Sequence, residues 1–575
     1  MNILKINFLK VVLLAATLSL SIIYNYNFDF WIRKEYEYYQ LFSVLLFTIV
    51  IFIFSNGPLK LGKVDISVIS ILVFLLLSRV SRLISFNEIH VLNTASLIFY
   101  YISLKTIHFQ KEDFTNYYNF IIGIGFFLSV YSLFELSGYI PSSNYYWNML
   151  GNFPNPAPLG GFIAVILLLI FNKLLQKEIR KKHLKLIVYI LIAILLLVVL
   201  IKSASRAAIL SLIVSVLILL LLKGVIKWKN LRYIILIGLP LLCFVFFYKG
   251  TDSVYGRLLI WKISFISFFE NPYAGISYGF FGVDYLNFQA TYFMNGGTNQ
   301  EILLAGATQQ TFNEFLKFVI ENGILGIILV MGCCFWILKP NTDFCNYIKR
   351  NSSIVSFSLY SVILVFAQFS YPLQFLPFKL ILLNQIGLQK YTPLFLNFTV
   401  KVNFQKILFC LMCCLIFFAS NYQYKGFKSW KEASELQFSD PNLSNTLYVF
   451  ASRRLENEVA FLSHYANIQK RPQEALVYYE KAKRLASFPG LYKKTAQINE
   501  NLGNYKRAEA DYLKIHFISP HLFLPLEQLL DFYNRRGDKK KSNYYAKKIL
   551  GTSIKIPSAE VTRIKHKAMN QLNFH

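Results

Sequence analysis

Long, uninterrupted apolar runs recur through the first 420 residues of the chain. Leu191–Leu200 and Ala207–Leu222 are, with their apolar neighbours, long enough to cross the hydrocarbon layer of a membrane as helices. Because hydrocarbon offers no partner for backbone polar groups, such runs predict an all-α, polytopic transmembrane helical bundle of about 12–13 spans. The predicted spans lie near residues 8–24, 40–55, 64–78, 89–105, 118–136, 159–175, 186–201, 206–222, 232–248, 316–338, 353–371, 374–389 and 406–420.

The balance of charged and apolar residues agrees with a membrane protein. Charged residues make up 15% of the chain and hydrophobic residues 55%, which leaves too few charges to cover a soluble protein of this size. The net charge of +29 comes mostly from Lys and Arg in short loops and in the tail. That placement favours control of topology and contact with lipid headgroups, and argues against a nucleic-acid partner.

The loops between the predicted spans give an orientation. Three strongly basic loops fall on one side together with the N-terminus, and the positive-inside rule makes that side cytoplasmic: Lys173–Lys185, Lys223–Arg232 and Lys339–Arg350. The opposite face receives a large loop at 249–313, and no Lys or Arg occurs from Ile263 to Leu316. We therefore expect a multi-spanning domain at 1–420 whose large loop lies on the outer face, where membrane enzymes assemble sites on extended loops.

The tail at 421–575 has a different character, with charged residues at helical spacing and an internal period. Gly503 and Gly537 are 34 residues apart, as are Ala508 and Ser542. This resembles tetratricopeptide repeats, which present a concave face to a protein partner. A solvated helical appendage is the alternative. Basic residues flank the last span on both sides, so the charge rule does not place the tail. We favour the outer face, because a docking module is most useful near a site on the large loop.

Three polar constellations lie near predicted outer ends of spans. Arg206 follows Lys202-Ser203-Ala204-Ser205 between two strongly apolar runs, where it is either a snorkelling anchor or an anion-binding group. Arg257 precedes Leu258–Phe269, whose apolar and aromatic spacing predicts an interfacial helix. Asn313 and Glu314 lie where the large loop re-enters the membrane, and the Glu314 carboxylate is either an ion-pair partner or a general base.

The order of these motifs resembles the O-antigen ligase and O-antigen polymerase superfamily of bacterial envelope glycosyltransferases. The resemblance covers about residues 145–335. It rests on these motifs in order: Gly151-Asn152-Phe153-Pro154-Asn155-Pro156, Ser203-Ala204-Ser205-Arg206, Arg257 with Trp261, Asn271-Pro272-Tyr273-Ala274-Gly275, Asn313-Glu314-Phe315-Leu316, and Glu321-Asn322-Gly323-Ile324-Leu325-Gly326.

The resemblance implies transfer of a glycan from an undecaprenyl-pyrophosphate carrier to an acceptor hydroxyl on lipid A-core, a growing polysaccharide or a protein. It also implies the bacterial inner membrane, so that the outer face, with the active loop and by our preference the tail, is periplasmic. The phosphate-binding arginines of the family fall on Arg206 and Arg257. Many ligases carry a histidine directly before the Asn of the re-entry motif, but this chain has Phe312 there, and no histidine lies between His183 and His464. The catalytic candidates are therefore Asn313 and Glu314, unless the acceptor needs little base assistance or the activity has diverged.

Several alternatives remain open at this stage. The sequence does not separate a ligase from a polymerase. A transporter or flippase of a lipid-linked or anionic substrate would use the same arginines, although it predicts internal repeats that the chain does not display. A noncatalytic scaffold built around the tail is a third possibility.

No Asp-x-Asp motif and no phosphate-cradling glycine loop occurs, so we expect neither a metal nor a nucleotide cofactor. Five loop aromatics are candidates for stacking on sugars or for packing: Tyr278, Phe280, Phe281, Tyr285 and Tyr292.

Overall fold

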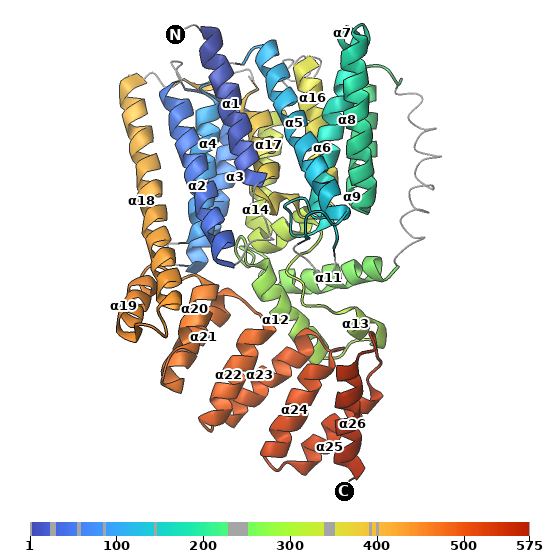
Figure 1. Cartoon of the computed structure of the whole chain (residues 1–575), viewed down its shortest axis with the longest axis vertical. Coiled ribbons are helices and arrows are strands. Elements are labelled where there is room, and N and C mark those ends of the chain that lie inside the picture. Colours follow the sequence, from blue (N-terminus) through green and yellow to red (C-terminus); the bar gives the residue numbers. More distant parts are fainter. Residues whose placement is uncertain are drawn as a thin grey trace. The chain divides into compact units, whose positions relative to one another are not determined.

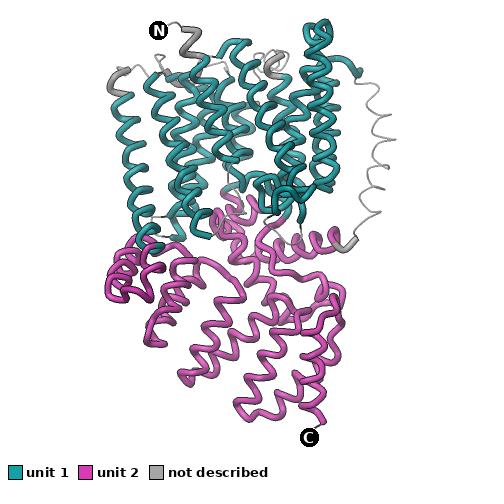
Figure 2. The backbone as a smooth tube through the Cα atoms, viewed as in Figure 1, with its two compact units in different colours: residues 1–249, 312–315, 326–431 teal, residues 250–311, 316–325, 432–575 magenta. Residues whose placement is uncertain are grey.

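A computed structural model describes most of the chain and divides it into two compact units. The described residues are 3–22, 30–54, 59–83, 88–107, 109–142, 147–227, 251–338, 351–389, 394–397 and 402–573. The span predicted at 232–248 and the basic loop at 339–350 lie outside them. Unit 1 contains Met1–Lys249, Phe312–Phe315 and Gly326–Lys431, and unit 2 contains Gly250–Thr311, Leu316–Leu325 and Glu432–His575 (Figures 1 and 2).

Unit 1 is a bundle of apolar helices. It contains α1 (Ile3–Ile22), α2 (Phe30–Ile53), α3 (Lys63–Leu83), α4 (Ile89–Leu104), α5 (Lys111–Leu136), α6 (Pro156–Leu174), α7 (Lys177–Arg180), α8 (His183–Lys202), α9 (Arg206–Leu222), α16 (Asn351–Ala367), η1 (Pro372–Gln374) and α17 (Leu376–Gly387). Two further helices, α14 (Glu314–Leu338) and α18 (Val402–Glu435), run from one unit into the other. The described residues also include one antiparallel strand pair, β1 (Lys60–Gly62) with β2 (Leu394–Asn397).

Length and apolar composition qualify seven described helices to cross a membrane: Phe30–Ile53, Lys63–Leu83, Lys111–Leu136, Pro156–Leu174, His183–Lys202, Glu314–Ile337 and Lys406–Glu435. Four shorter apolar helices accompany them: Phe8–Ile22, Ile89–Leu104, Arg206–Leu222 and Ile354–Ala367. Each overlaps a run predicted from the sequence, because a continuous apolar run in hydrocarbon has only the helix as a stable local structure. The predicted all-α, polytopic bundle is confirmed, and the chain is an integral membrane protein.

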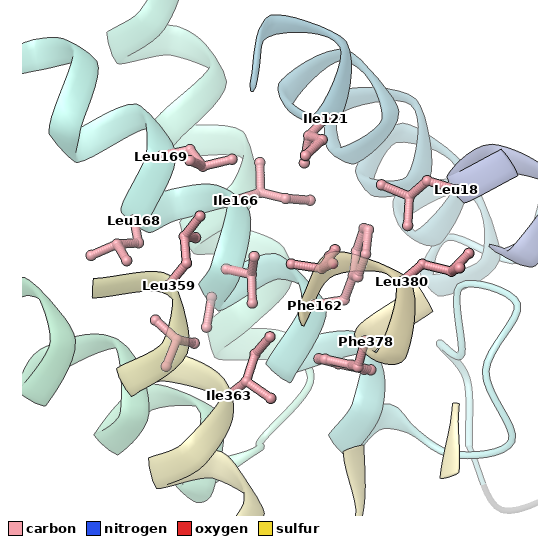
Figure 3. Packing of buried hydrophobic residues seen from close by; sticks show 14 of the residues in the cluster. Leu18, Ile121, Phe162, Ile166, Leu168, Leu169, Leu359, Ile363, Phe378 and Leu380 are labelled. Carbon is pink, nitrogen blue, oxygen red and sulfur yellow. The ribbon is translucent and has the colours of Figure 1, made fainter. Parts of the chain in front are cut away.

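The core of unit 1 is centred on α6. Residues Phe162 to Ile170 of this helix are all buried, whereas helices at the rim bury one face only. Figure 3 shows Phe162 and Ile166 of α6 among Leu359 and Ile363 of α16 and Phe378 of α17. Gly161 permits this packing, since a Cβ atom there would lie 2.3 Å from the Phe366 ring. The burial of α6 fixes its N-terminal end, which carries the Asn155 motif.

Unit 2 combines the large loop with the tail. The loop forms α11 (Thr251–Glu270), α12 (Phe281–Met294) and α13 (Asn299–Leu304). The tail forms α19 (Pro441–Ser452), α20 (Val459–Asn467), α21 (Pro472–Leu485), α22 (Pro489–Asn501), α23 (Tyr505–Ile518), α24 (Phe523–Arg535), α25 (Lys539–Gly551) and α26 (Ala559–Asn573). The helices α21, α23 and α25 begin at residues 472, 505 and 539, which reproduces the period seen in the sequence. Assignment of these helices to the tetratricopeptide family stays a prediction.

The loop and the tail share one hydrophobic core. Phe281, Tyr285 and Ala290 of α12 pack in the same buried cluster as Tyr512 and Leu526 of the tail. Polar contacts join the same surfaces, because the Gln289 side-chain amide donates to the Ile518 carbonyl at 2.6 Å and the Tyr492 hydroxyl donates to Asn287 Oδ1 at 3.2 Å. The loop and the tail therefore belong to one compact unit.

Candidate functional site

Arg206 begins α9 immediately after a tight turn in unit 1. The Ser205 hydroxyl caps this helix by accepting a hydrogen bond from Ala208 N at 3.4 Å, and Ala204 has a positive φ of 52°. The turn rests against the start of α6, since a Cβ atom on Gly160 would lie 2.7 Å from Ser203 Oγ and 2.9 Å from Ser205 Cβ. A guanidinium at the N-terminus of a helix adds its charge to the positive end of the helix dipole. This arrangement suits an anion.

The Asn155 motif is held in place by a buried carboxylate on α5. Glu135, with 3% of its surface exposed, accepts hydrogen bonds from Leu150 N at 2.9 Å and Gly151 N at 2.7 Å. Gly151 and Asn152 adopt positive φ angles of 55° and 68°, which turns the chain into α6. Asn155 caps α6 through Ala157 N at 3.0 Å, and its amide nitrogen donates to the Tyr371 hydroxyl. Glu135 thus fixes the entry to α6.

The re-entry motif contacts the segment between α16 and α17. Asn313 Oδ1 accepts from Phe315 N at 3.0 Å, while its amide nitrogen donates to Gln368 Oε1 at 3.4 Å. Glu314 Oε1 accepts from Leu373 N at 3.1 Å. The Phe312 ring meets the Tyr371 ring edge to face, with centroids 5.6 Å apart. Three stretches that are distant in sequence, around Asn155, Asn313 and Tyr371, therefore meet within unit 1.

Sequence reasoning assigned no part in the site to the segment from Gln368 to Leu373, most of which it placed in the span at 353–371. It carries neither a charge nor a recognisable motif, and its nearest signal was Pro372 at the start of the short η1 helix. Its contacts also reach far along the chain, since Asn155 and Tyr371 are 216 residues apart. Glu135 was missed for a similar reason, because its carboxylate bonds to backbone groups that carry no sequence signature.

Arg257 belongs to unit 2, on the first half of α11. Trp261, one turn further along, donates from its indole nitrogen to the Thr311 carbonyl at 2.9 Å and so ties α11 to the end of the loop. Lys262 Nζ bonds to Glu301 Oε1 and to the Tyr292 hydroxyl, both at 2.7 Å. Burial alone would raise the pKa of Glu301, but the hydrogen bonds from Lys262, Thr298 N and Tyr292 outweigh it and lower that pKa to about 2.

The Asn271–Gly275 motif and residues 321–325 of the Glu321–Gly326 motif contact each other within unit 2. Ile324 N and Leu325 N donate to the carbonyls of Pro272 and Tyr273 at 2.8 and 3.0 Å. Gly323 breaks α14 at this point with φ 61° and ψ −161°. Close approach requires glycines on both sides, since a Cβ atom on Gly323 would lie 2.3 Å from Tyr273 O, and one on Gly275 would lie 2.5 Å from the Glu321 carbonyl carbon. These motifs build the fold of the loop.

Glu321 has a structural position in unit 2. It is 1% exposed, and its carboxylate accepts from Phe281 N at 3.1 Å at the beginning of α12. Lys317 Nζ lies 3.9 Å from the same oxygen. Of the five loop aromatics, Phe280, Phe281 and Tyr285 are buried, so packing accounts for them, whereas Tyr278 and Tyr292 are half-buried. Arg206, Asn313 and Glu314 thus belong to unit 1 and Arg257 to unit 2, and their roles stay predictions.

The chain is a polytopic, all-α membrane protein whose large loop folds together with a helical tail. Within it, residues 191–331 match the model of the O-Antigen ligase family. This match confirms the predicted resemblance and supports a membrane glycosyltransferase of the O-antigen ligase or polymerase type. The matched range contains Arg206, Arg257, Asn313 and Glu314. No curated protein and no solved structure matches the chain.

Proposed function

We propose that this protein transfers a glycan from an undecaprenyl-pyrophosphate carrier to an acceptor hydroxyl on lipid A-core, polysaccharide or protein. The observation that carries the proposal is the match of residues 191–331 to O-antigen ligases, because it covers both arginines and the re-entry motif. Arg206 begins a capped helix, where the dipole and the guanidinium act together on an anion. Arg257 lies within the same matched range, on helix α11 of the large loop.

In the proposed reaction, the acceptor oxygen attacks the anomeric carbon of the glycan. A new carbon–oxygen bond forms as the bond between the anomeric carbon and the pyrophosphate breaks. The electron pair of the broken bond leaves with the lipid pyrophosphate. Arg206 and Arg257 stabilise that developing charge, where electrostatic stabilisation is most effective. Asn313 orients the acceptor, and the Glu314 carboxylate takes the proton from its hydroxyl. One Glu314 oxygen is hydrogen-bonded to Leu373 N, which fixes the orientation of the carboxylate.

Deletion of the protein in its source bacterium, followed by analysis of envelope glycans, tests this proposal. We expect the glycan to remain on its carrier lipid and to be missing from its acceptor. Loss of only the long-chain ladder of one glycan would identify a polymerase instead. A glycan-loaded carrier confined to the cytoplasmic leaflet would identify a flippase. Unchanged glycans and carrier lipid would exclude all three activities.

We also propose that the loop and the tail lie in the periplasm and that the spans lie in the inner membrane. The basic loops support this orientation, and the shared core supports a common compartment for loop and tail. Alkaline phosphatase fused after residue 575 should be active. Fluorescence from a cytoplasm-only fluorescent protein at the same position would instead place both the tail and the loop in the cytoplasm.

A further inference from the structure

Helix α11 has two apolar faces, and only one of them is used inside unit 2. Leu259 and Ile263 are 5% and 1% exposed and belong to the core that the loop shares with the tail. A second row follows the helix at steps of four, three, four and four residues: Val254, Leu258, Trp261, Phe265 and Phe269. These steps match the helical repeat, so the row forms one stripe.

The second stripe is open and strongly apolar. Leu258, Phe265 and Phe269 have 49%, 52% and 74% of their surface exposed. Tyr273, just after the helix, is 73% exposed. Water would be a poor solvent for several large apolar side chains arranged in one stripe, and such a patch marks an interaction surface.

Cations border this stripe and none lies within it. By helical geometry Arg257 lies on one edge and Lys262 on the other. Lys262 is held there by Glu301 and Tyr292, and it keeps 53% of its side chain exposed. An aromatic apolar face between basic edges is the arrangement of helices that lie in the headgroup layer of a membrane, where cations meet lipid phosphates.

The end of the stripe is also bonded to a helix that qualifies as a membrane span. Tyr273 O accepts a hydrogen bond from Leu325 N at 3.0 Å, so the end of α11 is fastened to α14. Leu325 is 53% exposed and lies in a helix that is long and apolar enough to cross a membrane. Tyr273, at the exposed end of α11, is therefore bonded to an exposed residue of a helix that qualifies to cross a membrane.

We propose that the α11 stripe, defined by Leu258, Phe265 and Phe269 with Tyr273, is embedded in the lipid headgroup region on the loop side of the membrane. Arg257, at the edge of the stripe, then lies at the depth of lipid phosphates. The loop then contacts the bilayer surface through this stripe, and the tail is attached to the loop through the shared core. This inference concerns binding to lipid and does not depend on the proposed transfer reaction.

Photocrosslinking in native membranes tests it. The Phe analogue p-benzoylphenylalanine is introduced singly at Phe265 or Phe269 of the full chain, and adducts are identified by mass after irradiation. Tyr544 of the tail is a matched control, because it is an aromatic residue of unit 2 with 58% of its surface exposed. Normal amounts of membrane-inserted protein establish that each variant folds.

We expect phospholipid adducts at residues 265 and 269, at least about tenfold more abundant than at residue 544. A crosslink to a second copy of the chain would show that the stripe is a dimer interface. A crosslink to another protein would show that it is a docking surface for that protein. Either result, or lipid adducts no more abundant than at Tyr544, would overturn the assignment to lipid. None of these readouts requires transferase activity.

Discussion

Arg206 and Arg257 are held by different local structures, although we assign both to the carrier pyrophosphate. Arg206 is the first residue of a capped helix, whereas Arg257 lies inside one. Lysine would preserve the charge at both positions but would lose the planar fork of donors. We expect Arg206→Lys and Arg257→Lys each to lower transfer at least about tenfold, equivalent to about 1.4 kcal/mol. Arg471→Lys, at a residue with a 79% exposed side chain, should not change the rate.

Rates are to be measured at matched amounts of membrane-inserted protein. Full activity in both arginine variants would refute the assignment of these arginines to the pyrophosphate. A loss of activity in only one variant would confine phosphate binding to that arginine.

Glu314 has a geometry that allows its proposed role as base to be separated from its structural role. Its Oε1 atom accepts the Leu373 N–H, and glutamine retains a carbonyl oxygen that accepts the same bond. Glu314→Gln should therefore fold normally and lose about a hundredfold or more in transfer rate, the range typical of a general base. Glu270→Gln, at an exposed residue of α11, serves as control. Wild-type transfer by Glu314→Gln across neutral pH would make Glu314 a structural residue.

His516 links the stability of unit 2 to pH. Burial and the nearby Lys548 charge lower its pKa to about 3, so the folded protein keeps this imidazole neutral. Unfolded chains bind the proton near pH 6.5, and acidification below that value therefore favours unfolding until about pH 3. We expect the thermal midpoint of unit 2 to fall less between pH 7 and pH 5 in His516→Gln than in wild type. The exposed His566→Gln should behave like wild type, and an unchanged pH response in His516→Gln would contradict the assignment.

At the scale of elements, the sequence predicted what depends on local pattern. Apolar runs placed the spans because length and hydropathy determine which segments enter hydrocarbon. The spacing of Gly503 and Gly537 indicated the period of the tail, which the starts of α21, α23 and α25 reproduce. Both glycines have positive φ angles, of 77° and 69°. The contact of Asn155 with Tyr371 could not be predicted, because neither residue carries a periodic signal and folding alone brings them together. The shared core was missed for the same reason, since an amphipathic α12 does not specify its partner.

The break in α14 at Gly323 can be tested by adding a single methyl group, the Cβ atom of alanine. Gly323 has a backbone conformation that only glycine adopts readily, and an added Cβ would meet Tyr273 O at 2.3 Å. Gly323→Ala should destabilise unit 2 by about 1–3 kcal/mol or more and lower its thermal midpoint. Gly332→Ala, in the same helix with open space around the added atom, should leave the midpoint unchanged or slightly raised. Equal midpoints for the two variants would disprove the structural role of the break.

At the scale of the whole molecule, loop and tail should unfold together because they share a core. Phe532 lies in α24, 2% exposed, in the cluster that also contains Phe281 and Tyr285 of α12. Phe532→Ala leaves a cavity worth about 3–5 kcal/mol. If unit 2 is cooperative, the amides of α12 should lose protection from hydrogen exchange although no loop residue has changed.

Phe461→Ala makes a comparable change in α20, outside the described members of that cluster, and should leave α12 protected. Unaltered protection of α12 in Phe532→Ala would mean that loop and tail fold independently. Loss of protection in both variants would extend the cooperative unit to α20.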